Sequence, residues 1–215
     1  MPSLITKGTI LNMLSSNNRY LTWLVPVLLL VLFVIILMMA PLEKTLGETI
    51  RLVYAHAAFT RAGMWGIYVS GLLGLLVAVT ANEQLHSWTQ SFAWVSFALF
   101  LIGGIFSIFA QRASWGGIAF AEPRMRTNLM VTAVMIIVLL INNWIPWIRV
   151  RGLLYTALAL YIAWAIPNTP LVLHPQDAVG TSPSLWIRLT FPTLTVLAML
   201  IGLWFVTYIK RPVAL

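Results

Sequence analysis

Two histidines and one glycine-rich segment carry the side chains in this sequence that could do chemistry. His56 lies in Tyr-Ala-His-Ala-Ala and His174 in Leu-His-Pro, each beside a different connection between long apolar segments. A third connection contains residues 115–124, with the sequence WGGIAFAEPR. Neutral imidazole nitrogens bind iron, and guanidinium groups pair with carboxylates through two parallel hydrogen bonds. Two imidazoles and nearby arginines on one membrane face would therefore suit a haem, with histidine on the iron and arginine on the propionates.

The composition places the chain in the membrane. It is 60% hydrophobic and 8% charged, whereas soluble domains carry about 25% charged residues. Only a polytopic membrane protein in contact with lipid fits these proportions. The formal net charge is +8, but the 13 Lys and Arg are scattered through short connections. Because no basic run is present, we expect no nucleic-acid partner.

The chain contains no cysteine. This excludes disulfides, thiolate metal sites, cysteine-ligated iron–sulfur clusters and the thioether attachment of a c-type haem. A haem held by this chain would therefore be a non-covalent haem b.

Six apolar segments are long enough to be considered as membrane-crossing helices, which need about 20 residues each. They are residues 20–40, 53–80, 91–111, 128–148, 152–167 and 187–209. The first is too long for a signal-peptide core of about 7–15 residues and is interpreted as a retained helix. The connections leave no room for another domain. We therefore predict an all-α fold, with residues 1–215 forming one bundle of six transmembrane helices.

An even number of spans puts both termini on one side, here called the terminal side, and leaves the other as the distal side. Lys and Arg on the terminal side are Lys7, Arg19, Arg149, Arg151, Lys210 and Arg211; those on the distal side are Lys44, Arg51, Arg61, Arg112, Arg124, Arg126 and Arg188. The two sides are nearly balanced under the positive-inside rule. The paired basic residues at 149–151 and 210–211 favour a cytoplasmic terminal side. We therefore expect a multi-pass protein of the inner (cytoplasmic) membrane whose distal connections are external.

Three connections face the distal side: residues 41–52, 112–127 and 168–186. His56 follows the first, and three prolines at 167, 170 and 175 restrict the backbone around His174. Each histidine taken alone also fits an ordinary amphipathic residue at the membrane boundary, and Arg124 and Arg126 equally fit lipid headgroup contacts. The third histidine, His86, is interpreted as interfacial, with no ligand role.

With these residues in view, the chain resembles the haem-handling family of cytochrome c maturation, in its six-span CcmC-like branch, over about residues 20–210. The family carries a loop of the form Trp-Gly-x-Trp-Trp-x-Trp-Asp-Pro-Arg between its third and fourth helices. Trp115 and Gly116 match its start, Glu122 stands at the position of the Asp, and Pro123 and Arg124 match its end. The central tryptophans of the family fall on residues 118, 119 and 121 here, where the chain has Ile, Ala and Ala.

The resemblance implies that His56 and His174 are axial iron ligands and that the tryptophan loop is a shelf for the porphyrin edge. Residues expected at the cofactor are Trp115, Gly116, Phe120, Glu122, Arg124, Arg126 and Arg61. Phe120 would replace part of the missing aromatic shelf. The implied function is to display haem for transfer to a haem chaperone, with subunits of an ABC-type transporter as further partners.

Two other functions remain open at this stage. The chain would also fit a haem b-binding subunit of a larger membrane redox complex, or a haem-free structural subunit that kept the fold. An ion channel is less consistent, because the spans have almost no charged residue in their middles. No nucleophile–base pair is present in the sequence, so we expect no enzymatic activity.

Overall fold

The computed structural model describes residues 7–170, 173 and 182–210, and side chains from residue 22 onward. The predicted iron ligand His174 lies outside the described residues. The described chain forms six helices: α1 (Lys7–Met39), α2 (Ile50–Thr80), α3 (Glu83–Trp115), α4 (Pro123–Asn142), α5 (Ile148–Ala165) and α6 (Leu185–Ile209). All six are long and apolar enough to cross a membrane. The prediction of an all-α, multi-pass membrane fold is therefore confirmed.

α1 begins at Lys7, well before the predicted start at residue 20, and α3 and α4 differ from the predicted spans at both ends. Glu83 to Trp115 is helical, so α3 is longer at both ends than residues 91–111. α4 begins at Pro123 and ends at Asn142, whereas the sequence predicted residues 128–148. Both starts are set by polar caps: Asn82 accepts a hydrogen bond from the backbone N of Leu85, and Glu122 accepts one from that of Met125. Such caps cannot be predicted from hydropathy, because they satisfy backbone N–H groups and hardly change the mean hydropathy of the span.

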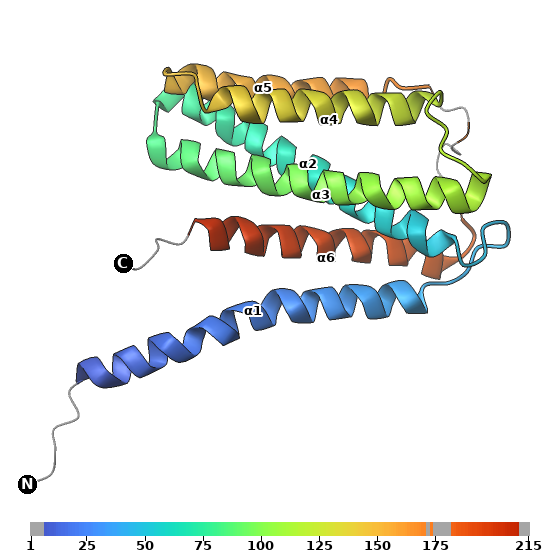
Figure 1. The fold of residues 1–215 in the computed structure, drawn as a ribbon, viewed down its shortest axis with the longest axis horizontal. Coiled ribbons are helices and arrows are strands. Elements are labelled where there is room, and N and C mark those ends of the chain that lie inside the picture. The colour runs from blue at the N-terminus through green and yellow to red at the C-terminus, as the bar shows by residue number, and fades with distance from the viewer. Residues whose placement is uncertain (1–6, 171–172, 174–181, 211–215) are drawn as a thin grey trace, which may run out of the picture.

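The helices form three layers with α2 running through the middle (Figure 1). α4 and α5 lie on one side, α6 and α1 on the other, and α2 crosses diagonally between them beside α3. α2 packs against α3, α5 and α6. Close approach to α3 depends on glycine: a Cβ on Gly103 would lie 2.6 Å from the backbone N of Thr60, and one on Gly63 would lie 2.7 Å from that of Phe100. Small residues at such crossings are typical of membrane bundles.

The buried core divides into two clusters, one on each side of α2. One joins α2 to α4 and α5 through large side chains such as Met135, Leu139 and Tyr155. The other joins α2 to α1 and α6 through Phe33, Phe191 and others. Polar residues of α2 therefore lie between α4 and α5 on one side and α1 and α6 on the other.

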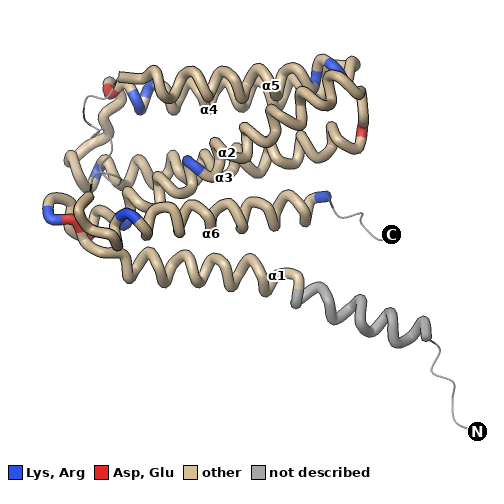
Figure 2. Tube along the Cα trace, turned by 180° about the vertical axis from the view of Figure 1, so that it is seen from behind, with Lys and Arg blue, Asp and Glu red and all other residues tan. Residues whose placement is uncertain are grey.

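Most of the described charged residues lie near the two ends of the bundle (Figure 2). On the terminal side, the Nη1 of Arg149 donates to the carbonyls of Ala78 and Val79, at 2.9 and 2.7 Å. These are among the last carbonyls of α2, which have no partner inside the helix. Arg149 therefore caps the end of α2. Its position is explained by this contact as well as by membrane orientation, so the count of Lys and Arg on each side is not a measure of orientation alone.

Candidate functional site

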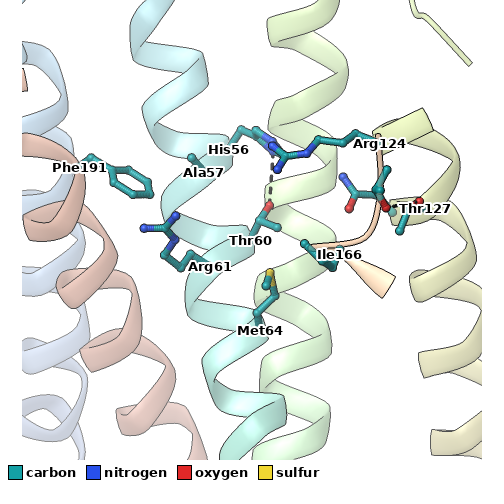
Figure 3. Close-up of a pocket in the computed structure, with 11 residues that line it drawn as sticks. His56, Ala57, Thr60, Arg61, Met64, Arg124, Thr127, Ile166 and Phe191 are labelled. Carbon is teal, nitrogen blue, oxygen red and sulfur yellow. Dashed lines mark hydrogen bonds between the residues drawn. The ribbon is translucent and has the colours of Figure 1, made fainter. Parts of the chain in front are cut away.

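Two cavities meet at His56 near the distal end of the bundle. The smaller, about 170 Å³, is here called the arginine cavity, because Arg61 and Arg124 both line it (Figure 3). The larger, about 440 Å³, is here called the apolar cavity and is lined by Trp115, Phe191 and a series of aliphatic side chains. His56, Ala57 and Phe191 line both. One imidazole therefore borders a cationic space and an apolar space.

The hydrogen bond of His56 determines its tautomer. The imidazole Nδ1 lies 2.9 Å from the carbonyl oxygen of Gly103 on α3. A carbonyl only accepts, so Nδ1 carries the proton and Nε2 carries the lone pair. The hydroxyl of Thr60, one turn along α2, lies farther from Nδ1, at 3.4 Å. Histidines that bind metals almost always donate their other ring N–H in this way to a carbonyl or carboxylate.

The two arginines reach the arginine cavity from different helices. Arg61 is exposed on α2, and its guanidinium carbon lies 4.5 Å from the ring centroid of Phe191 on α6, a cation–π contact. Arg124 is in the first turn of α4 and extends toward His56 (Figure 3). Opposite them, the hydroxyl of Thr169 donates to that of Thr127 at 2.8 Å, which ties the segment after α5 to α4. Two cations beside polar hydroxyls make this space suited to an anion.

Both arginines lie within helices, as the sequence predicted for Arg61 but not for Arg124. Arg61 is about 16 Å along α2 from Ile50, at 1.5 Å per residue. Arg124 and Arg126 belong to α4. The sequence placed Arg124 and Arg126 in the connection 112–127, because the fourth apolar span was predicted to begin only at residue 128, whereas α4 begins at Pro123.

The apolar cavity is bordered by the connection between α1 and α2. The carboxylate of Glu43 accepts hydrogen bonds from the backbone N of Thr45 and Leu46, at 2.8 and 2.9 Å. A hydrogen bond from the Thr45 hydroxyl, together with these two backbone bonds, holds the pKa of Glu43 below its usual value. Gly47 takes a left-handed conformation, with φ +52°, that closes the turn. The part of the α1–α2 connection that borders the cavity is therefore a hydrogen-bonded turn.

The glycine-rich segment is shorter than predicted and has a structural role at each end. Trp115 is the last residue of α3, so the connection covers residues 116–122 in place of the expected 112–127. Gly116 ends α3 in a left-handed conformation (φ +75°), and its N–H donates to the carbonyl of Arg112. Glu122 is buried and caps α4. The Glu-Pro-Arg sequence that resembles the family motif is therefore also a helix start, with proline in the first turn.

The predicted site residues divide into two groups. His56, Arg61 and Arg124 share the arginine cavity, and Trp115, 40% exposed, joins His56 at the apolar cavity. The others line neither cavity. They are Phe120, which is 60% exposed, Arg126, which is exposed, and the capping residues Gly116 and Glu122.

Several residues at the site were not predicted from the sequence. Gly103 supplies the carbonyl that binds His56, and Phe191 separates the two cavities. Both lie inside apolar spans, where glycine and phenylalanine are common and carry no chemical signal. Thr60 was recognisable, because it lies four residues after His56 and so on the same face of the helix.

His86, interpreted from the sequence as interfacial with no ligand role, is buried between helices at the terminal end, at 6% exposed. Its Nε2 lies 3.3 Å from the Oδ1 of Asn142, and the Nδ2 of Asn142 donates to the carbonyl of Arg151. The ring also packs near that of Tyr155. His86 therefore joins α3 to α4 and α5 at the terminal end.

The comparisons with known proteins give no further assignment. No protein-family model matches the chain, and no curated protein matches it in sequence. Among the residues that the structure describes, no group of three or more His, Cys, Asp or Glu side chains is placed to hold a bare metal ion.

Proposed function

We propose that this chain is a membrane haem-handling protein that binds haem b non-covalently at the distal end of its bundle and presents it to a haem chaperone. One observation carries the proposal: His56 lies where a cavity with two arginines meets an apolar cavity. Haem combines an apolar ring, an iron that accepts imidazole and two carboxylates. The two cavities offer a matching environment for each of these parts.

The imidazole of His56 suits iron ligation. Its Nδ1–H is donated to the carbonyl of Gly103, so the lone pair that an iron would take lies on Nε2. A bound haem would supply an iron centre that accepts imidazole. We propose that His56 and, from the sequence, His174 would hold this iron.

The arginine cavity suits the propionates. Arg61 and Arg124 approach it from α2 and α4, and each guanidinium can donate two parallel hydrogen bonds to a carboxylate. Phe191 holds the Arg61 side chain by a cation–π contact, which reduces the freedom lost on binding. On the other side of His56, Trp115 offers an aromatic face for the ring edge in the apolar cavity.

The location and partners follow from the same proposal. The six-helix fold would lie in the inner membrane, with the termini cytoplasmic and the distal cavities external. ABC-type transporter subunits and a haem chaperone would be its partners. The chain breaks no covalent bond in this function: its histidines hold and release the iron, and its arginines hold and release the carboxylates.

The first test is an absorption spectrum of the detergent-purified chain supplied with haem, oxidised and dithionite-reduced. We expect a low-spin b-type spectrum that is lost in His56→Ala and in His174→Ala. His86→Gln is the matched control, since it changes a histidine at the opposite end and keeps a hydrogen-bonding side chain. Absence of a haem spectrum in the wild-type chain would overturn the proposal and leave the structural-subunit interpretation.

A second measurement separates presentation from permanent retention, as in a haem b subunit of a redox complex. The exposure of Trp115, which lines the apolar cavity, favours presentation. Excess apomyoglobin is added to the haem-loaded chain, and the absorbance change is followed. Transfer of most of the haem within minutes would support presentation, whereas haem still on the chain after hours would favour the redox-complex subunit.

A further inference from the structure

A third cavity lies away from the haem site, on the lipid-facing side of the bundle. It is a groove of about 530 Å³ between α1, α3 and α6, lined almost entirely by apolar side chains. α1 packs against α6 and α2 but makes no close contact with α3 in the described chain, and α6 lies between them in Figure 1. The groove is the space left between α1 and α3.

α1 is attached to the bundle at two places that lie on either side of this space. Trp23 packs against Trp204 and Tyr208 of α6, with centroid distances of 4.8 and 5.0 Å. Deeper in the membrane, Phe33 packs against Phe59 of α2 at 5.0 Å. Between these contacts α1 exposes apolar side chains, and a gap of this kind within a bilayer is filled by an apolar molecule.

The size of the groove favours a lipid chain over a helix. A transmembrane helix needs more than five turns, about 20 residues. Along α3 the groove runs from Trp94 to Ile102, about 12 Å at 1.5 Å per residue. That length is close to one leaflet, about 15 Å or half the hydrocarbon thickness.

A cation lies next to the terminal end of the groove. Lys210 directly follows Ile209, which lines the groove. Its Nζ lies 5.7 Å from the ring centroid of Trp88 and donates to the hydroxyl of Ser87. Among the described residues, the only ion pair is that of Arg51 with Glu48, so no described carboxylate neutralises Lys210. Aromatic residues such as Trp23 and Tyr208 at this level are typical of the membrane–water interface.

We propose that this groove is a binding site for one acyl chain of an anionic phospholipid from the terminal-side leaflet, with the phosphate at Lys210. The chain lies between α1 and α3 and completes the packing that these helices do not make with each other. Zwitterionic lipids enter the same groove but gain less at the headgroup, because their net charge is zero.

The test is native mass spectrometry of the detergent-purified full chain, incubated separately with phosphatidylglycerol and phosphatidylcholine of identical acyl chains. We expect one strongly retained phosphatidylglycerol per chain. Ala98→Trp fills the groove from α3 and should lower the retained fraction about tenfold. Leu160→Trp is the matched control, on an exposed part of α5 outside the groove. Lys210→Gln should keep lipid binding but lower the preference for phosphatidylglycerol severalfold.

Circular dichroism and gel filtration establish that the tryptophan variants fold. If Ala98→Trp does not, Val27→Trp blocks the groove from α1 and replaces it in the comparison. Equal retention of phosphatidylglycerol in the groove-filled variant and in Leu160→Trp would overturn the proposal. A co-purifying polypeptide that displaces phosphatidylglycerol from the wild-type chain would overturn it as well.

Discussion

The two ends of the bundle each contain a helical histidine, and the surroundings of the two side chains differ. At the distal end, His56 donates Nδ1–H to a backbone carbonyl and borders two cavities. At the terminal end, His86 donates to the side chain of Asn142 and is enclosed by packed helices. An imidazole held by the backbone beside open space is oriented for a ligand. One held by a buried amide contributes to packing, and residue type alone does not distinguish the two.

The largest expected effect concerns the two cations, Arg61 and Arg124, that line a cavity at the distal end. Arg61→Gln combined with Arg124→Gln removes two charge-assisted interactions with haem carboxylates, each of about 1.5–3 kcal/mol. We expect haem affinity to fall about 100-fold or more in a spectroscopic titration. Arg126→Gln is the control, since Arg126 is exposed on the same helix as Arg124 and lines neither cavity. An equal loss in the control would show that net charge matters and the cavity does not.

The next effect concerns the helix crossing that holds His56 in place. A Cβ on Gly103 would meet the backbone of Thr60, whereas one on Gly104 would meet nothing within 4 Å. Gly103→Ala should therefore destabilise the bundle by about 1–3 kcal/mol, the usual cost of overpacking. Gly104→Ala should raise stability by about 0.5–1 kcal/mol through helix propensity. Thermal unfolding in detergent measures both, and similar midpoints for the two variants would contradict the proposed crossing.

Substitution of the two histidines should have opposite effects on stability and on haem binding. His86→Ala leaves the buried amide of Asn142 without its donor, which costs about 1–3 kcal/mol. It should lower the unfolding temperature and leave haem binding by the folded fraction unchanged. His56→Ala should do the reverse, with lost haem binding and a smaller change in stability. An unfolding temperature of His86→Ala equal to that of the wild-type chain would contradict the structural role of His86.

The smallest effect is the pH dependence of the turn that borders the apolar cavity. Because hydrogen bonds lower the pKa of Glu43 in the folded chain, their stabilisation is present above its unfolded value of 4.5. It is lost as the pH falls through the lowered folded pKa. Amide exchange in residues 41–49 should therefore be slower, after correction for intrinsic rates, at neutral pH than below pH 4.5. Glu43→Gln should show fast exchange at both, and protection unchanged by the substitution would exclude this role.

Hydropathy and composition were sufficient to predict the six membrane-spanning helices. Runs such as residues 20–40 and 187–209 are apolar throughout, and burying that much apolar surface in hydrocarbon dominates any local preference. The helix ends at α3 and α4 were not predictable in the same way. They depend on single capping residues, Asn82, Gly116 and Glu122, whose effect on the hydropathy of a span is negligible.

The sequence by itself determined the class of fold, the absence of thiol chemistry and the choice of His56 and the arginines as candidates. Only the tertiary structure decided which candidates meet. His56, Arg124 and Phe191 come from three helices that are far apart in the chain, and their meeting depends on the diagonal path of α2 and on its glycine contacts with α3. Hydropathy is a local sum along the chain, whereas proximity depends on how helices tilt and pack. The same packing enclosed His86 and converted part of the glycine-rich segment into helix caps.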